Sequence, residues 1–272
     1  MIKEVLEKTD ALEEKIQALL AEEEKTEEIK VLQEEKKKLL DSCKDLEPGD
    51  RVFLARHPRR PHVEDFVSAL FTDFFEQKGD HLYDEDRSIY GGIARFHGRP
   101  VTVLGHRKGR TVEENLSCNF GMTCPEGYRK AKRLMEQAEK FDRPIITFVD
   151  TPGAYPGLEA EQHGQGEAIA KNLAFMSSLH VPVIAVVTGE GSSGGALGIC
   201  VANKILMLEN AIYSVLSPEG FATILWKDSS RAAEAAKVMK LTAKDLKEAN
   251  VADEVVPESL GGAQDDPESL YK

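Results

Sequence analysis

One stretch near the middle of the sequence, residues 181–198, constrains the fold most strongly. Residues 183–187 are apolar and mostly β-branched, which is typical of a strand buried on both faces of a sheet. A cluster of four glycines follows this strand: Gly189, Gly191, Gly194 and Gly195. An apolar segment that begins at Ala196 then predicts a helix. Glycines leave backbone amides uncovered, and uncovered N–H groups at a helix start suit an anion or a developing oxyanion.

Several interpretations fit this glycine turn. Residues 189–194 match the G-x-G-x-x-G pattern of dinucleotide-binding folds. Residues 191–195 match the G-x-S-x-G elbow of hydrolases, with Ser193 as the nucleophile. A third interpretation is an oxyanion hole made of backbone amides alone, and a fourth is a tight turn without a ligand. A P-loop is excluded because no Gly-Lys-Ser/Thr follows.

The composition indicates a globular protein with an excess of acidic groups. The 272 residues are 41% hydrophobic and 30% charged, and the net charge of -12 argues against general nucleic-acid binding. No apolar run reaches the length of about 18 residues that a membrane span requires. The N-terminus has no apolar signal core, so we expect a cytoplasmic protein. The four cysteines are scattered, and we expect no metal site in this chain.

We expect three regions along the chain. Residues 1–50 are highly charged and carry narrow apolar stripes at helical spacing, which predicts two amphipathic helices that could form a hairpin. Such helices must dock on the main domain or on a partner. The main domain is predicted to cover residues 51–264, and residues 265–272 read as a polar tail.

Strands and helices alternate within the main domain. Residues 63–77 predict one helix with a broad apolar face, and residues 91–105 predict a β-hairpin. A cationic loop follows at 106–110, and its Arg107 and Lys108 could hold phosphates or could simply be solvated. Strand, glycine turn and helix then occur twice, at 144–179 and again at 181–198. This alternation is typical of a parallel sheet with right-handed crossovers.

A set of longer motifs extends from about residue 55 to residue 267. The motifs are Ala55–Pro58, Gly91–Arg95, Asn119–Met122, Pro125–Lys130, Asp150–Gly157, Gly189–Gly191 with Ser193–Leu197, Ser217–Gly220, Ile224–Lys227 and Leu260–Ala263. Together they resemble the carboxyltransferase α subunits of the bacterial acetyl-CoA carboxylase. The chain departs from the family pattern at Ser192, where the family usually has glycine.

The resemblance implies a fold, a set of partners and a reaction. It implies an α/β, crotonase-like spiral of ββα units with an N-terminal helical extension. It also implies a β subunit of the same fold that carries zinc, an α2β2 assembly, a biotin carboxyl carrier protein and a biotin carboxylase. The implied reaction transfers the carboxyl group from carboxybiotin on the carrier to acetyl-CoA. The product, malonyl-CoA, enters fatty-acid biosynthesis.

The resemblance also assigns residues to the site. Gly194 and Gly195, with Ala196 as a further candidate, would donate backbone hydrogen bonds to the ureido oxygen of biotin, where negative charge develops on loss of CO2. The substrate-binding residues would be Gly153, Ala154, Tyr155, Gly191, Ser193, Arg107 and Lys108. Arg107 and Lys108 could contact either CoA or the carrier.

The competing interpretations differ in how well they fit the rest of the chain. The hydrolase elbow requires a histidine after the serine, but all seven histidines precede Ser193. A serine protease that pairs Ser193 with His163 has no evident acid beside them. The dinucleotide pattern occurs late, after an equivalent strand and turn that lack it. Two alternatives stay open: a non-catalytic scaffold for the β subunit, and a carboxyltransferase for another acyl-CoA.

Overall fold

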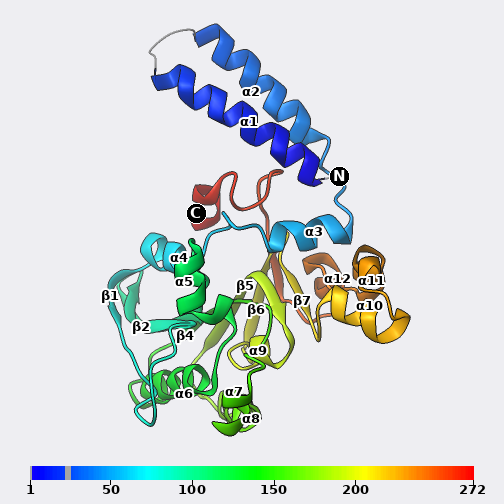
Figure 1. The fold of residues 1–272 in the computed structure, drawn as a ribbon. Helices are drawn as coiled ribbons and strands as arrows, with labels where there is room; N and C mark the ends of the chain where they lie inside the picture. The colour runs from blue at the N-terminus through cyan, green and yellow to red at the C-terminus, as the bar shows by residue number, and fades with distance from the viewer. Residues whose placement is uncertain (1, 22–25) are drawn as a thin grey trace.

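The computed structural model describes residues 2–21 and 26–272, which form a mixed sheet flanked by helices and a helical hairpin that extends from this body (Figure 1). The strands are β1 (Thr72–Glu76), β2 (Ile89–Phe96), β3 (Arg99–His106), β4 (Ile145–Thr151), β5 (Val183–Ser192), β6 (Lys204–Leu208), β7 (Ile212–Ser214) and β8 (Glu254–Val256). The α-helices are α1 (Ile2–Ala21), α2 (Thr26–Asp41), α3 (Pro48–Ala55), α4 (Val63–Leu70), α5 (Val112–Ser117), α6 (Pro125–Lys140), α7 (Leu158–Gln162), α8 (Gln165–Met176), α9 (Ser193–Leu197), α10 (Pro218–Trp226), α11 (Ala232–Met239) and α12 (Ala243–Glu248). Short 3-10 turns cover Asn119–Gly121, Ser229–Arg231 and Pro267–Tyr271.

The sheet has the order β1-β2-β3-β4-β5-β6-β8, and β7 pairs with the distal part of β5. The β1–β2 and β2–β3 pairs are antiparallel, and the later pairs are parallel. The expected β-hairpin at 91–105 and the expected parallel sheet are therefore confirmed. The carboxyl ends of β3, β4 and β5 lie at the same edge of the sheet, so the loops that follow them meet there.

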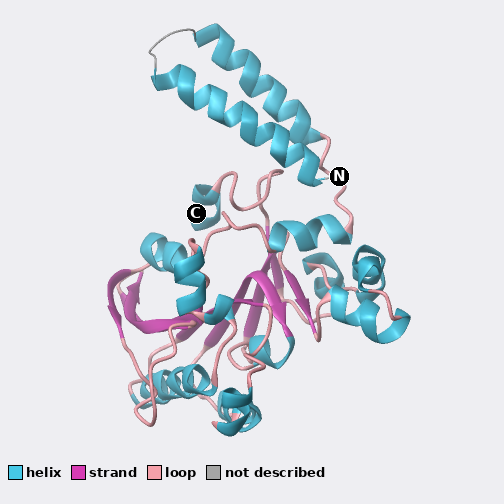
Figure 2. Ribbon diagram, viewed as in Figure 1, coloured by secondary structure: helices cyan, strands magenta, loops and turns pink. Residues whose placement is uncertain are grey.

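Both faces of the sheet are covered, as Figure 2 shows. Helices α6 and α8 pack against each other, and α6 covers β2 and β3. Helix α4 also packs on β2 and β3, and α3 contacts β5. Because the central strands are buried between these layers, side chains such as Val103, Ile145 and Val187 are completely excluded from solvent.

Helices α1 and α2 pack side by side in the described part of the N-terminal region, so the expected hairpin is confirmed. A separate apolar cluster joins the hairpin to α3 and includes Ile2, Leu40 and Leu54. The residues between the helices, 22–25, lie outside the described part. A division of the chain near residue 50 stays a prediction.

One predicted segment was wrong. The helix predicted for 63–77 ends at Leu70, and residues 72–76 form the edge strand β1 instead, because their backbone pairs with the free edge of β2. This pairing prevails over the helical spacing of the phenylalanines. The predicted polar tail, residues 265–272, makes a contact with the body. Tyr271 makes an edge-on contact with Phe66.

Candidate active site

The glycine turn lies where β5 ends and α9 begins (Figure 1). Strand β5 continues through Gly189 and Gly191 as far as Ser192. The helix predicted to begin at Ala196 begins at Ser193, whose φ of 57° lies in the left-handed region. The first N–H groups of a helix have no acceptor within it. The amides of Ser193, Gly194 and Gly195 therefore have no acceptor within α9.

The glycines within β5 allow polar groups to approach the strand closely. A Cβ atom at Gly189 would lie 2.4 Å from Oδ1 of Asp150, and this oxygen accepts a hydrogen bond from the Glu190 amide at 2.9 Å. The same oxygen pairs with Nζ of Lys108 at 2.6 Å. Asp150 thus connects the end of β4 to the strand before the turn, and Lys108 neutralises its charge.

The two glycine turns expected from the sequence meet in space. A Cβ atom at Gly195 would lie 2.5 Å from the backbone nitrogen of Ala154, so only glycine allows the two backbones to approach this closely. Gly153 has a φ of 146°, which also favours glycine. The Tyr155 amide donates to the Thr123 carbonyl at 3.0 Å and fixes the first turn from its other side. The structure therefore brings Gly153, Ala154 and Gly195 together.

A cavity of about 250 Å³ opens beside the start of α9. Its lining consists of Ser193, Gly194, Leu197, Tyr213, Ser214, Val215, Leu246 and Val251. Most of these side chains are apolar, and Val215 is 80% exposed. Gly195 and Ala196 are buried behind the rim, so Gly194 is the best exposed of the three glycine-turn donors that the sequence suggests.

Sequence reasoning missed the apolar walls of this cavity. Leu197 follows the turn directly, so its place beside the cavity could have been inferred from a helical turn of α9. Val215 and Val251 follow different strands and helices, and no spacing in the sequence connects them with the turn. Only the pairing of β7 with the distal part of β5 brings Tyr213 and Val215 to this position.

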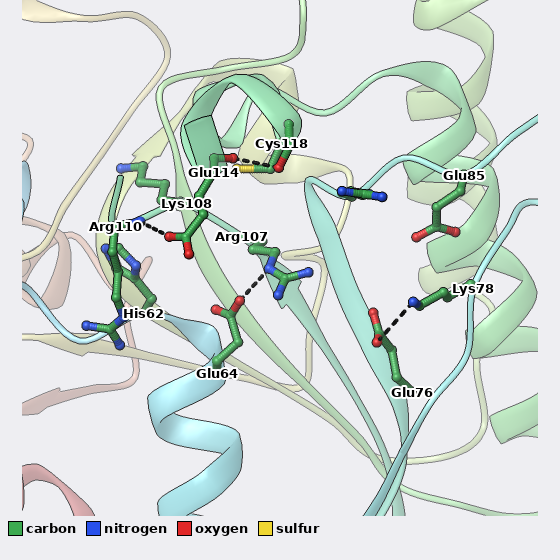
Figure 3. A pocket seen from close by; sticks show the side chains of 13 residues that line it. His62, Glu64, Glu76, Lys78, Glu85, Arg107, Lys108, Arg110, Glu114 and Cys118 are labelled. Atoms are coloured by element: carbon green, nitrogen blue, oxygen red, sulfur yellow. Dashed lines mark hydrogen bonds and ion pairs between the residues drawn. The ribbon is translucent and has the colours of Figure 1, made fainter. Parts of the chain in front are cut away.

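The cationic loop lies in a different, larger cavity of about 520 Å³ (Figure 3). Arg107 pairs with Glu64 and lies over the ring of Tyr90, and Arg110 pairs with Asp65. Lys108 extends to Asp150. These cations are therefore largely matched by carboxylates. A contribution of Arg107 and Lys108 to substrate binding stays a prediction.

The protease interpretation finds no support in the contacts of Ser193. His163 pairs through Nδ1 with Glu126 at 2.9 Å and lies edge-on to Tyr83. Among the described residues, no hydrogen bond connects Ser193 to a histidine. The described residues also contain no group of His, Cys, Asp and Glu side chains arranged to hold a metal ion, and no described helix could cross a membrane.

Ion pairs of Arg56 hold the strand that leads to the turn. Arg56 makes two bonds to Glu190, including one of 2.6 Å, and also reaches Glu219 on α10 at 2.8 Å. Glu190 is only 4% exposed, so this pairing compensates the cost of burying its charge. The end of β5 is thus fixed to both α3 and α10.

The arrangement of the sheet and its helices defines a class of protein. The transcarboxylase 12S core, solved with methylmalonyl-coenzyme A bound, superposes with a TM-score of 0.63 at 20% identity, over 78% of this chain and 41% of that chain. The β subunit of geranyl-CoA carboxylase from P. aeruginosa gives a TM-score of 0.60 at 16% identity, over 79% of this chain and 42% of that chain. At these identities the likeness concerns the fold, which is the crotonase-like fold of carboxyltransferases, as expected.

Sequence comparison identifies the family within this class. The family described as acetyl co-enzyme A carboxylase carboxyltransferase-like matches residues 2–272. The acetyl-coenzyme A carboxylase carboxyl transferase subunit alpha of Anoxybacillus flavithermus is 61% identical over 218 residues, which are 80% of this chain and 67% of that protein. The chain therefore belongs to the family of acetyl-CoA carboxylase carboxyltransferase α subunits, and the resemblance seen in its motifs is confirmed.

Proposed function

We propose that this chain uses the amides of Gly194 and Gly195 to bind the ureido oxygen of carboxybiotin, and so transfers its carboxyl group to acetyl-CoA. Carboxybiotin would arrive on a biotin carboxyl carrier protein that a biotin carboxylase has charged, and malonyl-CoA would be the product. The observation that carries the proposal is a pair of helix-start amides without intrahelical acceptors, of which the Gly194 amide belongs to a residue that lines an apolar cavity and the Gly195 amide lies directly behind it.

The chemistry of carboxyl transfer matches what these residues offer. Release of the carboxyl group leaves negative charge on the ureido oxygen, and the ureido nitrogen can take the proton from the acyl methyl group. A backbone amide aimed at such an oxygen is worth roughly 3–4 kcal/mol of transition-state stabilisation. No side-chain base is then required from this chain. Ser193 would then be a turn residue and not a nucleophile, which is consistent with this mechanism.

The cavity beside α9 suits the compact, fused bicyclic ring of biotin. Leu197, Val215 and Val251 offer apolar walls, and the Gly194 amide lies at the rim. Exclusion of water by such walls strengthens each hydrogen bond to the developing charge. Gly153, Ala154 and Tyr155 would form the floor around Gly195, and Gly191 would allow Tyr213 to approach the cavity. The role of Ala196, which is completely buried, would be secondary.

The chain would supply half of a site that a β subunit completes. The β subunit, which carries zinc, would bind the thioester enolate, and the complex would be an α2β2 assembly in the cytoplasm. Apolar side chains at the cavity rim favour this arrangement, because Val215 is 80% and Leu197 is 42% exposed in the isolated chain. Arg107 and Lys108 would contact CoA phosphates or the carrier once their carboxylate partners rearrange.

The decisive test compares two substitutions at Gly194. A Cβ atom here would meet only Ile169, at 3.7 Å, so Gly194→Ala keeps the amide and fits, whereas Gly194→Pro removes the N–H group. With the β subunit, we expect Gly194→Pro to lower kcat for biotin-dependent malonyl-CoA decarboxylation about 100- to 1000-fold relative to Gly194→Ala.

Thermal unfolding and gel filtration must show that both variants fold and assemble. Equal activity of the two variants would exclude the Gly194 amide as a donor. Full activity of every variant at the turn would favour the alternative that this chain only scaffolds the β subunit. Rates measured with other acyl-CoA substrates would decide the acyl specificity.

A further inference from the structure

We propose that the buried hydroxyl of Tyr128 is a positioning group, which holds the Gly195 carbonyl and thereby orients the turn that donates to the ureido oxygen. Tyr128 lies on α6, is not among the residues that line the cavity, and has a completely buried side chain. It does not contact the substrate. This inference rests on the proposed function and adds a residue to it.

The contact to Gly195 replaces a helical hydrogen bond. In a continuing α-helix the Ile199 amide would donate to the Gly195 carbonyl. Here the Ile199 amide donates to the Ala196 carbonyl at 3.2 Å, and the Gly198 amide donates to Gly194 at 3.0 Å. The hydroxyl of Tyr128 donates to the Gly195 carbonyl instead, at 3.1 Å. The carbonyl is therefore oriented by a side chain from another element.

A glycine that donates a catalytic hydrogen bond needs such external restraints. Glycine has no Cβ, so its φ and ψ are less restricted than those of any other residue. The structure restrains Gly195 at two places. The backbone of Gly153 and Ala154 closes the space at its Cα, and Tyr128 fixes its carbonyl. Since a peptide group is planar, fixing the carbonyl fixes the plane that carries the Ala196 amide, and together with the closed space at its Cα this limits the rotation of Gly195.

Tyr128 is itself held in place by a buried chain of hydroxyl groups. Ser88 lies within hydrogen-bonding distance of Thr123, at 3.0 Å between the oxygens, and Thr123 interacts with the hydroxyl of Tyr128. All three side chains are completely buried. Burial raises the pKa of Tyr128, so its hydroxyl stays protonated and acts as a donor. Such hydrogen bonds in sequence polarise one another and strengthen the last donor.

The hydrogen-bonded series of Ser88, Thr123 and Tyr128 also contacts the other glycine turn, at Gly153 to Tyr155. The carbonyl of Thr123 accepts the Tyr155 amide at 3.0 Å and the side-chain amide of Gln165 at 2.8 Å. Thr123 therefore contacts the turn at Gly153 to Tyr155 directly and the turn at Gly195 through Tyr128. Loss of the hydroxyl group of Ser88, Thr123 or Tyr128 would loosen the turn at Gly195 without removing any group from the cavity.

The test is Tyr128→Phe, which removes one oxygen and keeps the ring that packs against Gly198. We expect kcat for biotin-dependent malonyl-CoA decarboxylation by the α–β complex to fall about 10- to 100-fold, because displacement of catalytic groups has effects of this size. The KM for malonyl-CoA should stay unchanged, since Tyr128 touches no substrate. Tyr271→Phe is the matched control, because Tyr271 packs on Phe66 instead of the turn, and its kcat should change by less than about twofold.

Thermal unfolding of both complexes separates positioning from stability. A purely structural role would lower the unfolding temperature and leave kcat unchanged where both complexes are fully folded, and this result would overturn the inference. If Tyr128→Phe does not assemble, Thr123→Val decides with the same assays: a fall in kcat supports the inference, and an unchanged kcat overturns it. An inactive wild-type complex would instead refute the proposed function itself, and with it this inference.

Discussion

The contact between the two glycine turns makes a sharp prediction about Gly195→Ala. A methyl group at this position would lie 2.5 Å from the Ala154 nitrogen, whereas atoms in ordinary contact are about 3.5–4 Å apart. The opposing atoms belong to the backbone, so they cannot turn aside. Overpacking of this kind costs about 3 kcal/mol at the upper end of its usual range. Alanine recovers about 1 kcal/mol through its higher helix propensity, which leaves a net loss of about 2 kcal/mol.

Gly194→Ala provides the matched comparison, because it makes the same chemical change one residue earlier. Its methyl group would meet Ile169 at 3.7 Å, an ordinary contact, and neither glycine has a positive φ. We expect Gly194→Ala to be neutral or up to about 1 kcal/mol more stable than the wild type. The two variants should then differ by about 3 kcal/mol, or roughly 6–12 °C in the midpoint of thermal unfolding for a chain of this size.

Circular dichroism or calorimetry of the isolated chains measures this difference directly. Activity gives a second readout, since Gly195→Ala should also displace the donor amide and lower kcat in the complex with the β subunit. Equal unfolding midpoints for the two variants would refute the close approach of the turns. A Gly195→Ala variant that is more stable than Gly194→Ala would refute it more strongly.

Two further predictions concern buried ionisable groups. Burial lowers the pKa of His106 to about 4. Between about pH 6.5 and pH 4 the unfolded chain therefore binds a proton that the folded chain does not, so the free energy of unfolding falls as the pH falls. In His106→Asn this fall should be smaller by about 3 kcal/mol. Urea unfolding from pH 4 to pH 7 checks this, and parallel curves for the two proteins would contradict it. Arg60→Met should lower the free energy of unfolding by about 3–5 kcal/mol, because it leaves the buried Glu258 without its cation. The double variant with Arg60→Met and Glu258→Leu should be less destabilised than Arg60→Met alone. The reverse order in urea unfolding would argue against a coupled pair.

Much of the fold could be predicted because its signals are local. The apolar runs at β4 and β5, the proline that opens α6 and the serine that caps α10 each identify an element without reference to the rest of the chain. The segment at 72–76 could not be predicted in this way. Its phenylalanines have helical spacing, and only the exposed edge of β2 makes a strand the better solution.

The same distinction applies to the candidate site. Gly153 and Gly195 stand out in the sequence because glycines cluster there, and the structure brings them into contact. The Tyr128 hydroxyl and the walls at Val215 and Val251 gave no signal, because each reaches the turn from an element distant in sequence. A tyrosine in a helix is ordinarily a core residue, and its single hydrogen bond becomes visible only in three dimensions.

The placement of the proposed donors on the backbone has a consequence for inhibition. A compound that accepts hydrogen bonds from the Gly194 and Gly195 amides would contact groups that no ordinary point mutation other than to proline can delete. Substitution of Gly195 is opposed by the backbone that faces it. Resistance would therefore have to arise in the side chains that line the cavity, such as Leu197, Tyr213 or Val215. For a compound that binds the amides and avoids these side chains, few substitutions would confer resistance.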